Sequence, residues 1–422
     1  IDPDEAFMQA RHADEAVAKN RPLGLLHGVP MTIKDALKVN GFTTSCGCKG
    51  LVRKCNSDAT VVARLRAQGV IILGLTNVSE LTMSPETDNT LYGRTNNPYN
   101  LEYSPGGSSG GEAAIIAVGG SPLGLGTDGG GSIRIPAHCC GIAGIKPTHG
   151  LLPNTGNLLG DFSGIFHRIV SYGPMARYVE DLILSLPILA GPDGRDYNAV
   201  PVALKDPAKV DLSRLKIVYH FSNGVSMPTP ETIKGMQNAL EALNAKVAEV
   251  SEKCPKILEK TYRLLWETIF LGGDQAEGIQ SWLKTINVEE PSPLLQSFIE
   301  IAKKCSFTVA DLRSRLIEWD NFHTQMLIFM EDYDVLLCPV QATPARKHGN
   351  GYAAPEEMTF TMSYNLVGWP SAVVRCGTSP EGLPIGIQIV AKSWDDHLVL
   401  AIAQELENAL GGWQPPNLPG IP

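Results

Sequence analysis

Two glycine-rich serine segments within residues 104–147 constrain this chain more than any other feature. The first is Gly106-Gly107-Ser108-Ser109-Gly110-Gly111 and the second is Asp128-Gly129-Gly130-Gly131-Ser132, with a run rich in Ala, Ile and Val between them. Glycine lets the backbone approach a neighbouring chain or a ligand closely, and it adopts positive φ angles that other residues avoid. The two segments therefore predict a pocket that is lined by peptide N–H groups and two serine hydroxyls.

Helical and strand patterns alternate on both sides of these segments. Helical apolar spacing is followed by a short apolar run at residues 57–69 and 70–74, and the pattern returns at residues 113–118 and 123–126. Further strands are expected at 215–219, 334–339 and 384–390, a short buried segment at 142–145, and further helices at 2–20, 180–189, 230–243 and 398–410. This alternation predicts an α/β fold with helices on the faces of a sheet. We expect residues 1–422 to form one domain in which residues 195–330 are a mostly helical cover.

Composition limits the class of protein. The net charge of −9 and the absence of a Lys/Arg run longer than two argue against nucleic acid as a partner. The sequence contains no stretch of about 18 apolar residues that would predict a membrane-spanning helix. Nine cysteines, an odd number spread over 422 residues, suit reduced thiols and a cytoplasmic protein. Because the chain begins at Ile1 rather than Met, we expect an upstream segment to be missing.

Two cofactor interpretations compete with a serine-based site. Cys46, Cys48 and Cys55 are close in sequence, but they lack the spacing and the second ligand pair of a structural metal site. The glycine turns could instead cradle a phosphate, but no Gly-Lys-Ser/Thr follows either turn, and the acid that a dinucleotide fold requires about 20 residues further on is absent. We therefore expect neither a metal nor an organic cofactor.

The serines need a base to become nucleophiles. None of the nine histidines lies in a recognisable nucleophile motif, and His138 and His149, which follow the second turn, are expected to have structural or supporting roles. Lys34 follows an apolar segment and precedes Asp35, and burial would favour its neutral form. A buried lysine with two glycine-embedded serines suggests a Ser–Ser–Lys relay, and the glycine N–H groups beside Ser132 suggest an oxyanion hole.

Four segments resemble the amidase signature family of serine hydrolases, which includes fatty-acid amide hydrolases, bacterial amidases and the glutamyl-tRNA amidotransferase A subunit. They are Gly28–Asp35 (GVPMTIKD), Gly106–Glu112 (GGSSGGE), Gly126–Pro136 (GTDGGGSIRIP) and Gly382–Gln388 (GLPIGIQ). The resemblance extends from about residue 25 to the C-terminal helix. It implies a large mixed β-sheet that helices cover on both faces.

The resemblance also implies roles for individual residues. Ser132 is the expected nucleophile, Lys34 the base, and Ser108 the bridging serine, which is preceded by a cis peptide bond. The oxyanion hole would comprise Gly129, Gly130, Gly131 and Ser132. Ser109, Thr127, Asp128 and Arg134 are expected to support the loop without reacting. Gly129 stands where the family often has Ile or Thr.

The substrate is less constrained by the sequence. Residues in segments that border the pocket in relatives form an apolar set that suits an aryl or alkyl amide, although each could equally be core: Met83, Tyr92, Leu158, Phe162 and Tyr364. We expect hydrolysis of small, largely apolar amides, with esters and carbamates as further substrates. One alternative is the A-type subunit of a glutamine-dependent amidotransferase, and another is a non-catalytic binding protein on the same fold. A homodimer stays open.

Overall fold

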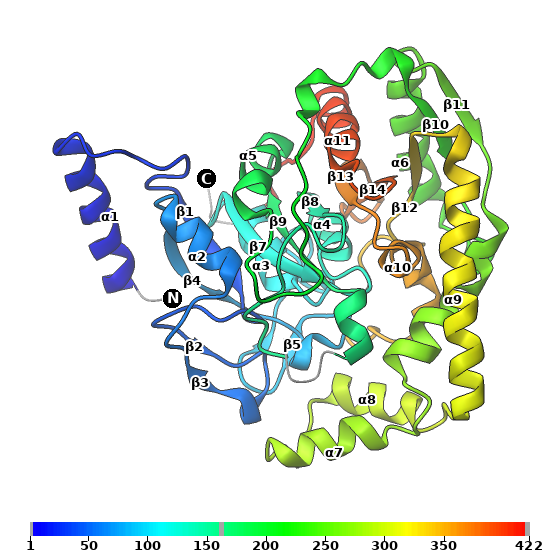
Figure 1. Ribbon diagram of the computed structural model, residues 1–422, viewed down its shortest axis with the longest axis horizontal. Coiled ribbons are helices and arrows are strands. Elements are labelled where there is room, and N and C mark those ends of the chain that lie inside the picture. Colours follow the sequence, from blue (N-terminus) through cyan, green and yellow to red (C-terminus); the bar gives the residue numbers. More distant parts are fainter. Residues whose placement is uncertain (1–2, 160–163, 418–422) are drawn as a thin grey trace.

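A ten-stranded mixed sheet forms the centre of the computed structural model, which describes residues 3–159 and 164–417 (Figure 1). The strand order is β11-β10-β12-β14-β13-β8-β9-β7-β1-β4. In that order the strands are Glu249–Glu252, Lys216–Tyr219, Val335–Pro339, Pro384–Ala391, Ser371–Thr378, Ala143–Lys146, Ser171–Ala176, Leu123–Asp128, Pro30–Lys34 and Ile71–Thr76. Two short pairs lie outside this sheet, β2 (Thr43–Thr44) with β3 (Arg53–Lys54) and β5 (Asp88–Asn89) with β6 (Gly93–Arg94).

The directions of the strands determine at which edge of the sheet the glycine turns lie. Strand β1 runs parallel to β4 and β7, whereas β7 pairs antiparallel with β9. Because the carboxyl ends of parallel strands meet at one sheet edge, the chain leaves β1 and β7 at the same edge. Every residue of β7 is buried, as expected for a strand that is covered on both faces.

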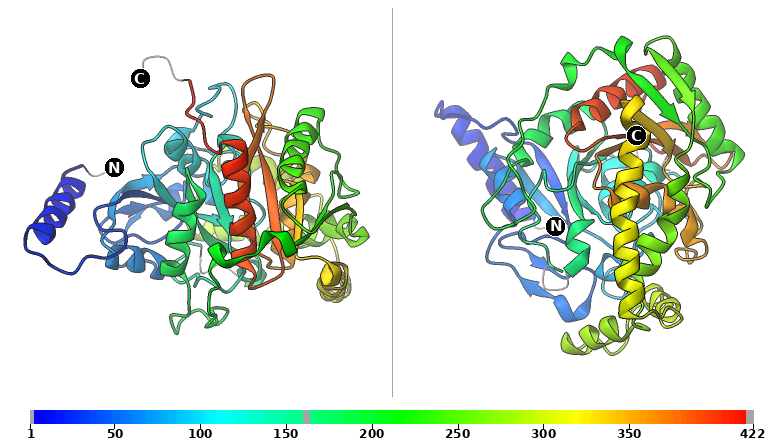
Figure 2. Two further views of the ribbon diagram at one scale, coloured as in Figure 1. Left: turned by 90° about the horizontal axis from the view of Figure 1, so that it is seen from above. Right: turned by 45° about the vertical axis from the view of Figure 1, so that its right-hand side comes forward.

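Helices cover both faces of the sheet (Figure 2). Helices α5 (Val179–Leu189), α6 (Pro230–Asn244) and α11 (Asp396–Leu410) pack together on one face, and α3 (Gly110–Ala117) and α4 (Arg134–Cys140) pack on the other. Strand β13 demonstrates the two-sided core, since Val373 belongs to the cluster around α4 while Ala372 and Val374 belong to the cluster around α11. The predicted α/β class with both faces covered is confirmed.

The remaining helices pack around these layers. Residues 195–330 contain the π-helix η8 (Tyr262–Phe270) and helices α7 (Glu277–Thr285), α8 (Pro293–Ala302) and α9 (Val309–Phe329), but they also supply β10, β11 and α6 to the central layers. Helix α2 (Thr60–Ala67) packs near α5, α10 (Thr359–Leu366) packs near η8, and α1 (Pro3–Ala18) projects from one side of the body (Figure 1). Among the described residues, no helix has the length and apolar character needed to cross a membrane.

Candidate active site

Lys34 ends β1 and is completely buried. Its Nζ donates hydrogen bonds to Ser108 Oγ at 2.7 Å, to Thr127 Oγ1 at 2.8 Å and to the Thr127 carbonyl at 3.3 Å. Thr127 lies at the carboxyl end of β7, which runs parallel to β1, so the sheet register brings lysine and threonine together. Burial lowers the pKa of Lys34 to about 7, although nearby Cys46, Asp128 and Glu112 act in the opposite direction.

Ser108 lies in the first glycine turn, just before α3. The peptide bond between Gly107 and Ser108 is cis. Glycine is required at position 107 because a Cβ there would lie 2.6 Å from the carbonyl oxygen of Ser84. The next serine supports the same turn, since Ser109 Oγ donates to the Thr127 carbonyl at 3.3 Å and its N–H donates to the Ser132 carbonyl at 3.2 Å. The two turns are therefore bonded directly to each other.

Ser132 lies in the second turn, between β7 and α4, and is partly exposed to a cavity that Ser108 also lines. Within residues 3–159 and 164–417, the backbone N–H groups of Gly129, Gly130 and Ser132 donate to no other group of the chain. Gly131 differs from the expectation, because its N–H donates to Asp128 Oδ1 at 2.8 Å. The prediction that Gly131 contributes a free donor is wrong, and three donors remain available.

A buried ion pair fixes the second turn. Asp128 Oδ1 lies 2.9 Å from Arg134 Nη2, and both side chains are fully buried. The guanidinium also donates to Gln388 Oε1 at 2.6 Å, to Asn365 Oδ1 at 2.5 Å and to the Thr361 carbonyl at 2.8 Å. Burial alone would raise the pKa of Asp128, but the charge and hydrogen bonds of Arg134 hold it well below its usual range. Asp128 is therefore a stable anion that orders the turn.

The cavity in front of the serines has a volume of about 750 Å³, part of it open to solvent. Its described wall combines six apolar side chains with seven polar ones and two glycines, and the only ionisable side chain among them is His167. The described wall consists of Ala36, Thr82, Met83, Ser108, Thr127, Gly129, Gly130, Ser132, Asn154, Asn157, Leu159, Phe166, His167, Val170 and Phe270.

Only some of the predicted pocket residues line the cavity. Met83 lines the cavity, as expected. Tyr92 does not, because it is 57% exposed and borders a different surface cleft. Leu158 packs in a small cluster with Ala36, Cys46 and Cys55, and its neighbour Leu159 lines the cavity instead. Phe162 lies outside the described residues.

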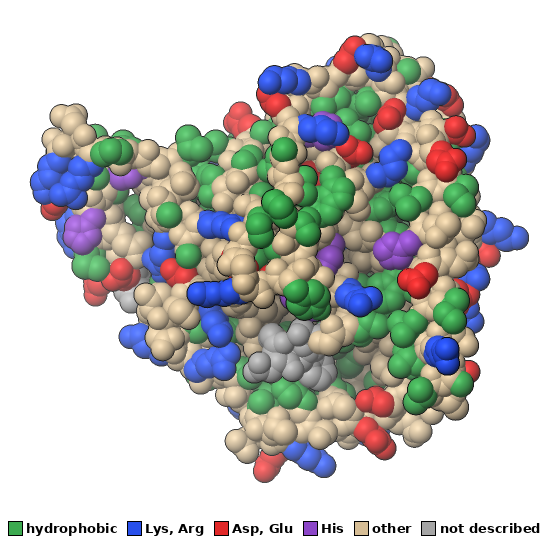
Figure 3. All heavy atoms as spheres, in the orientation of Figure 1, with side chains coloured by type: hydrophobic (Ala, Val, Ile, Leu, Met, Phe, Trp, Pro, Cys, Tyr) green, Lys and Arg blue, Asp and Glu red, His purple; other side chains and the backbone are tan. Residues whose placement is uncertain are grey.

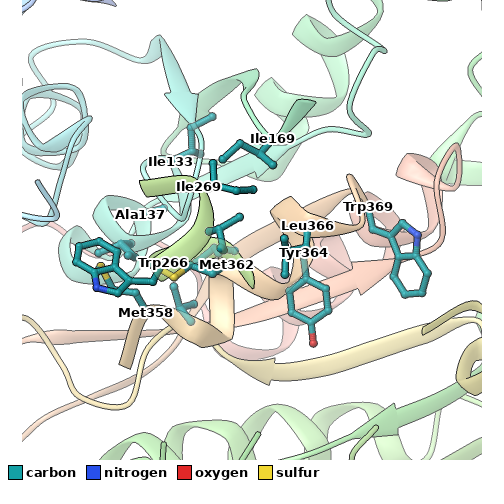
Figure 4. Packing of buried hydrophobic residues seen from close by; sticks show 14 of the residues in the cluster. Ile133, Ala137, Ile169, Trp266, Ile269, Met358, Met362, Tyr364, Leu366 and Trp369 are labelled. Atoms are coloured by element: carbon teal, nitrogen blue, oxygen red, sulfur yellow. The ribbon is translucent and has the colours of Figure 1, made fainter. Parts of the chain in front are cut away.

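Tyr364 is also absent from the cavity wall. It is fully buried in α10, and Figure 4 shows its ring directed away from Ile133 and Ile169. Its hydroxyl lies 3.4 Å from His220 Nε2 and 3.5 Å from Cys338 Sγ, within the core. The alternative noted from the sequence, core packing, therefore describes Tyr364.

The two histidines that follow the second turn are structural, as predicted. His138 is fully buried; its Nδ1 accepts from the Gly386 N–H at 2.9 Å, and its Nε2–H donates to the Thr343 carbonyl at 3.1 Å. His149 Nδ1 lies 3.1 Å from the Val170 carbonyl. Burial lowers the pKa of each imidazole to about 4, and neither histidine lines the serine cavity.

Several site residues carry no local sequence signal. His167 lines the cavity with its Nε2 2.9 Å from Asp196 Oδ1, and Asn154 and Phe270 reach the same wall from distant segments. Asn365, which bonds to both Asp128 and Arg134, is likewise beyond what the sequence predicts. These residues come from loops and helices whose patterns indicate only packing or turns.

Charged side chains of both signs are mixed on the molecular surface. Figure 3 shows Lys/Arg and Asp/Glu side chains interspersed over the face in view, with apolar side chains between them. All nine cysteines are free thiols, and Cys46, which is buried, lies close enough to Lys34 to influence its charge. Within the described ranges no group of three or more His, Cys, Asp or Glu side chains is arranged to hold a metal ion.

The mixed sheet thus brings a buried lysine and two glycine-embedded serines together beside one cavity. The family model described as "Amidase" matches residues 1–400, so the chain belongs to the amidase family. The fold class and the enzyme class expected from the sequence are thereby confirmed.

Individual relatives agree with this membership. An acylamidase of Rhodococcus erythropolis is 34% identical, and the match covers 96% of this chain and 86% of the relative. The A subunit of the glutamyl-tRNA(Gln) amidotransferase of Bacillus velezensis is 33% identical, with 97% and 89% covered. The crystal structure of a bacterial aryl acylamidase of the amidase signature family superposes with a TM-score of 0.81 at 26% identity, covering 96% of this chain and 87% of that one.

Proposed function

We propose that this protein hydrolyses small, largely apolar amides through an acyl-enzyme on Ser132, with Ser108 and Lys34 as the proton relay. The observation that carries the proposal is the 2.7 Å contact between Lys34 Nζ and Ser108 Oγ, at the wall of the cavity onto which Ser132 opens. A buried amine whose pKa is lowered to about 7 is half neutral near physiological pH, and only the neutral amine can accept a proton.

Acylation then proceeds by linked proton transfers. Neutral Lys34 takes the proton of Ser108, Ser108 takes the proton of Ser132, and the Ser132 oxygen forms a bond to the carbonyl carbon. The carbonyl π electrons move onto oxygen and give a tetrahedral oxyanion. When the oxyanion collapses, the C–N bond breaks, and the proton held on Lys34 returns through Ser108 to the leaving nitrogen. Protonation is needed because an amine anion leaves poorly.

Deacylation repeats the path with water. Lys34 accepts a proton through Ser108 from a water molecule that attacks the acyl carbon of the Ser132 ester. Collapse of this second intermediate breaks the bond to Ser132 and releases the carboxylic acid. The proton returns to the Ser132 oxygen, so the enzyme ends in its starting state.

The unpaired N–H groups of Gly129, Gly130 and Ser132 are the donors that we assign to the oxyanion. They line the cavity beside the nucleophile and donate to nothing else in the described chain. A single donor of this type is typically worth about 3–4 kcal/mol of transition-state stabilisation. The Asp128–Arg134 pair contributes indirectly, because it fixes the turn from which these donors project.

The cavity wall favours an apolar amide over glutamine. Met83, Phe166 and Phe270 present apolar surface, and no Asp, Glu, Lys or Arg is found among the described lining residues. A free amino acid carries an ammonium and a carboxylate, and each would lose hydration without a partner of opposite charge. Esters and carbamates place the same carbonyl before the nucleophile, and we include them as substrates.

Hydrolysis of an acyl nitroanilide by purified protein tests the proposal. Ser132→Ala should lower kcat/KM by about 10⁴-fold or more, because the nucleophile is lost. Ser185→Ala, a buried serine on the opposite face of the sheet, should not alter it. A fluorophosphonate probe should label the wild-type protein and not Ser132→Ala. Unchanged hydrolysis in Ser132→Ala would refute the assignment, absence of labelling and turnover would favour a binding protein, and release of ammonia from glutamine would favour the amidotransferase alternative.

A further inference from the structure

The carboxylate of Glu112 is buried beneath the candidate site and has no role in the steps above. Glu112 lies in the first turn of α3 and is 0% exposed. Its Oε1 accepts from the Thr32 hydroxyl, and its Oε2 accepts from the Thr76 hydroxyl at 2.6 Å. No salt bridge to this carboxylate is found among the described residues. A charge in this position is costly, so its presence needs an explanation.

The chain makes room for this carboxylate specifically. Gly124 of β7 faces it, and a Cβ at that position would lie 1.9 Å from Glu112 Oε1. Thr32 and Thr76 are themselves almost fully buried, so their hydroxyls serve the carboxylate rather than solvent. Three neighbouring strands thus contribute a cradle for one side chain.

The cradle adjoins Lys34. Thr32 precedes Lys34 by two residues in β1, so both side chains project from the same face of the strand. Thr76 is the residue of β4 that lies opposite Lys34 in the parallel register. Both hydroxyls that hold the carboxylate are therefore immediate neighbours of the lysine, and Glu112 follows the relay serine Ser108 by four residues.

Three acidic groups influence Lys34, and only Glu112 has a variable charge. Asp128 is held as an anion by Arg134. Burial raises the pKa of the Cys46 thiol well above its ordinary value, so that thiol stays neutral. Burial raises the pKa of Glu112 to about 7, against the effect of the two threonine hydroxyls, and burial lowers the pKa of Lys34 to about 7. Because each group acts on the other, the titrations of lysine and glutamate are coupled.

We propose that Glu112 is a positioning residue whose buried charge sets the fraction of Lys34 that is neutral and able to act as the base. An ionised Glu112 stabilises the ammonium, whereas a protonated Glu112 releases Lys34 to accept a proton. The inference rests on the proposed function, since it assigns Glu112 a role only through Lys34.

The pH dependence of kcat/KM for Glu112→Gln tests the inference. Glutamine keeps the shape but removes the negative charge, so the pKa of Lys34 should fall. The acid limb of the profile, in which kcat/KM falls as the pH falls, should then move to lower pH by about one unit. This shift corresponds to a tenfold rise in kcat/KM at a given pH on that limb. Asp396→Asn is the matched control, because Asp396 is also fully buried, accepts from a threonine, and has a pKa raised by burial, yet it does not act on Lys34. Its acid limb should stay in place.

A second variant keeps the test valid if Glu112→Gln does not fold. Thr76→Val removes one hydrogen bond to the carboxylate and so raises the pKa of Glu112 further, which should shift the acid limb in the same direction by a smaller amount. If the acid limb of both variants coincided with that of the wild type, or lay at higher pH, this inference alone would be overturned. If Lys34→Met hydrolysed the substrate with the same pH profile as the wild type, both this inference and the proposed base would be overturned.

Discussion

The protonation state of Lys34 gives the sharpest test of the proposed mechanism. Its pKa is lowered to about 7 by burial, and only the neutral amine can start the relay. The free enzyme should therefore lose kcat/KM as the pH falls through about 7. At one pH unit below the pKa about one-tenth of the lysine is neutral, and at two units about one-hundredth, so kcat/KM should fall tenfold per unit.

A histidine base would give a different profile. Burial lowers the pKa of both His138 and His149 to about 4, so a reaction that depended on either imidazole would keep its full rate down to about pH 5. The two hypotheses differ by about 100-fold in kcat/KM at pH 5 relative to the plateau. Initial rates of nitroanilide hydrolysis between pH 4.5 and 9, with circular dichroism at each pH to verify folding, would separate them.

Lys146 is the necessary control for this experiment. It is also fully buried, and its pKa is also lowered to about 7, chiefly by burial, but its Nζ donates to the Pro147 carbonyl and not to a serine. Lys146→Met should retain an acid limb near pH 7, whereas Lys34→Met should abolish turnover. A limb that disappears in Lys146→Met, or a profile that is flat from pH 8 to pH 5, would contradict the assignment of Lys34.

Other variants test the supports around the site. Arg134→Met should destabilise the protein by about 3–5 kcal/mol in urea unfolding, because the buried Asp128 carboxylate loses its partner; a loss below about 1 kcal/mol would show that the pair does not hold the turn. Thr127→Val removes the 2.8 Å hydroxyl contact to Lys34 that stabilises the ammonium, so its acid limb should lie at lower pH than that of the wild type, and an upward shift would contradict this geometry. Phe270→Ala should widen the cavity at the edge-to-face contact with Phe166 (5.3 Å between ring centroids) and raise kcat/KM for bulky relative to small anilides; an unchanged ratio would place the substrate elsewhere.

Much of the sheet can be predicted from apolar runs, but strand β9 cannot. The runs at 334–339 and 384–390 correspond to β12 and β14, and that at 123–126 to β7. Strand β9 contains Gly173 and Pro174, which ordinarily argue against a strand interior. The glycine is needed there because a Cβ would lie 1.9 Å from the carbonyl oxygen of Ile145 in the adjoining β8 segment. Only the packed sheet reveals that constraint.

The candidate site divides in the same way. Lys34, Ser108 and Ser132 lie in continuous sequence motifs whose glycines have a local meaning, so sequence alone can identify them. Tyr92 and Tyr364 were expected in the pocket because of their segments, but the direction of a side chain depends on tertiary packing that a segment does not encode. The rest of the cavity wall is assembled from loops and helices that are distant in sequence, such as those of His167 and Phe270, and no local pattern connects them.

The candidate site is held by contacts from both halves of the chain. The proposed base and relay serine contact each other within the N-terminal half, since Lys34, Ser108 and Thr127 all lie within residues 34–127. The nucleophile turn, in contrast, is fixed through Arg134, whose guanidinium bonds to Asn365 of α10 and Gln388 of β14. Because those partners follow Arg134 by more than 200 residues, the donors beside Ser132 can be ordered only after the C-terminal strands have joined the sheet. The turn that carries the proposed nucleophile therefore depends on contacts with the C-terminal half of the chain, whereas the hydrogen-bond partners of Lys34, which are Ser108 and Thr127, come from the N-terminal half.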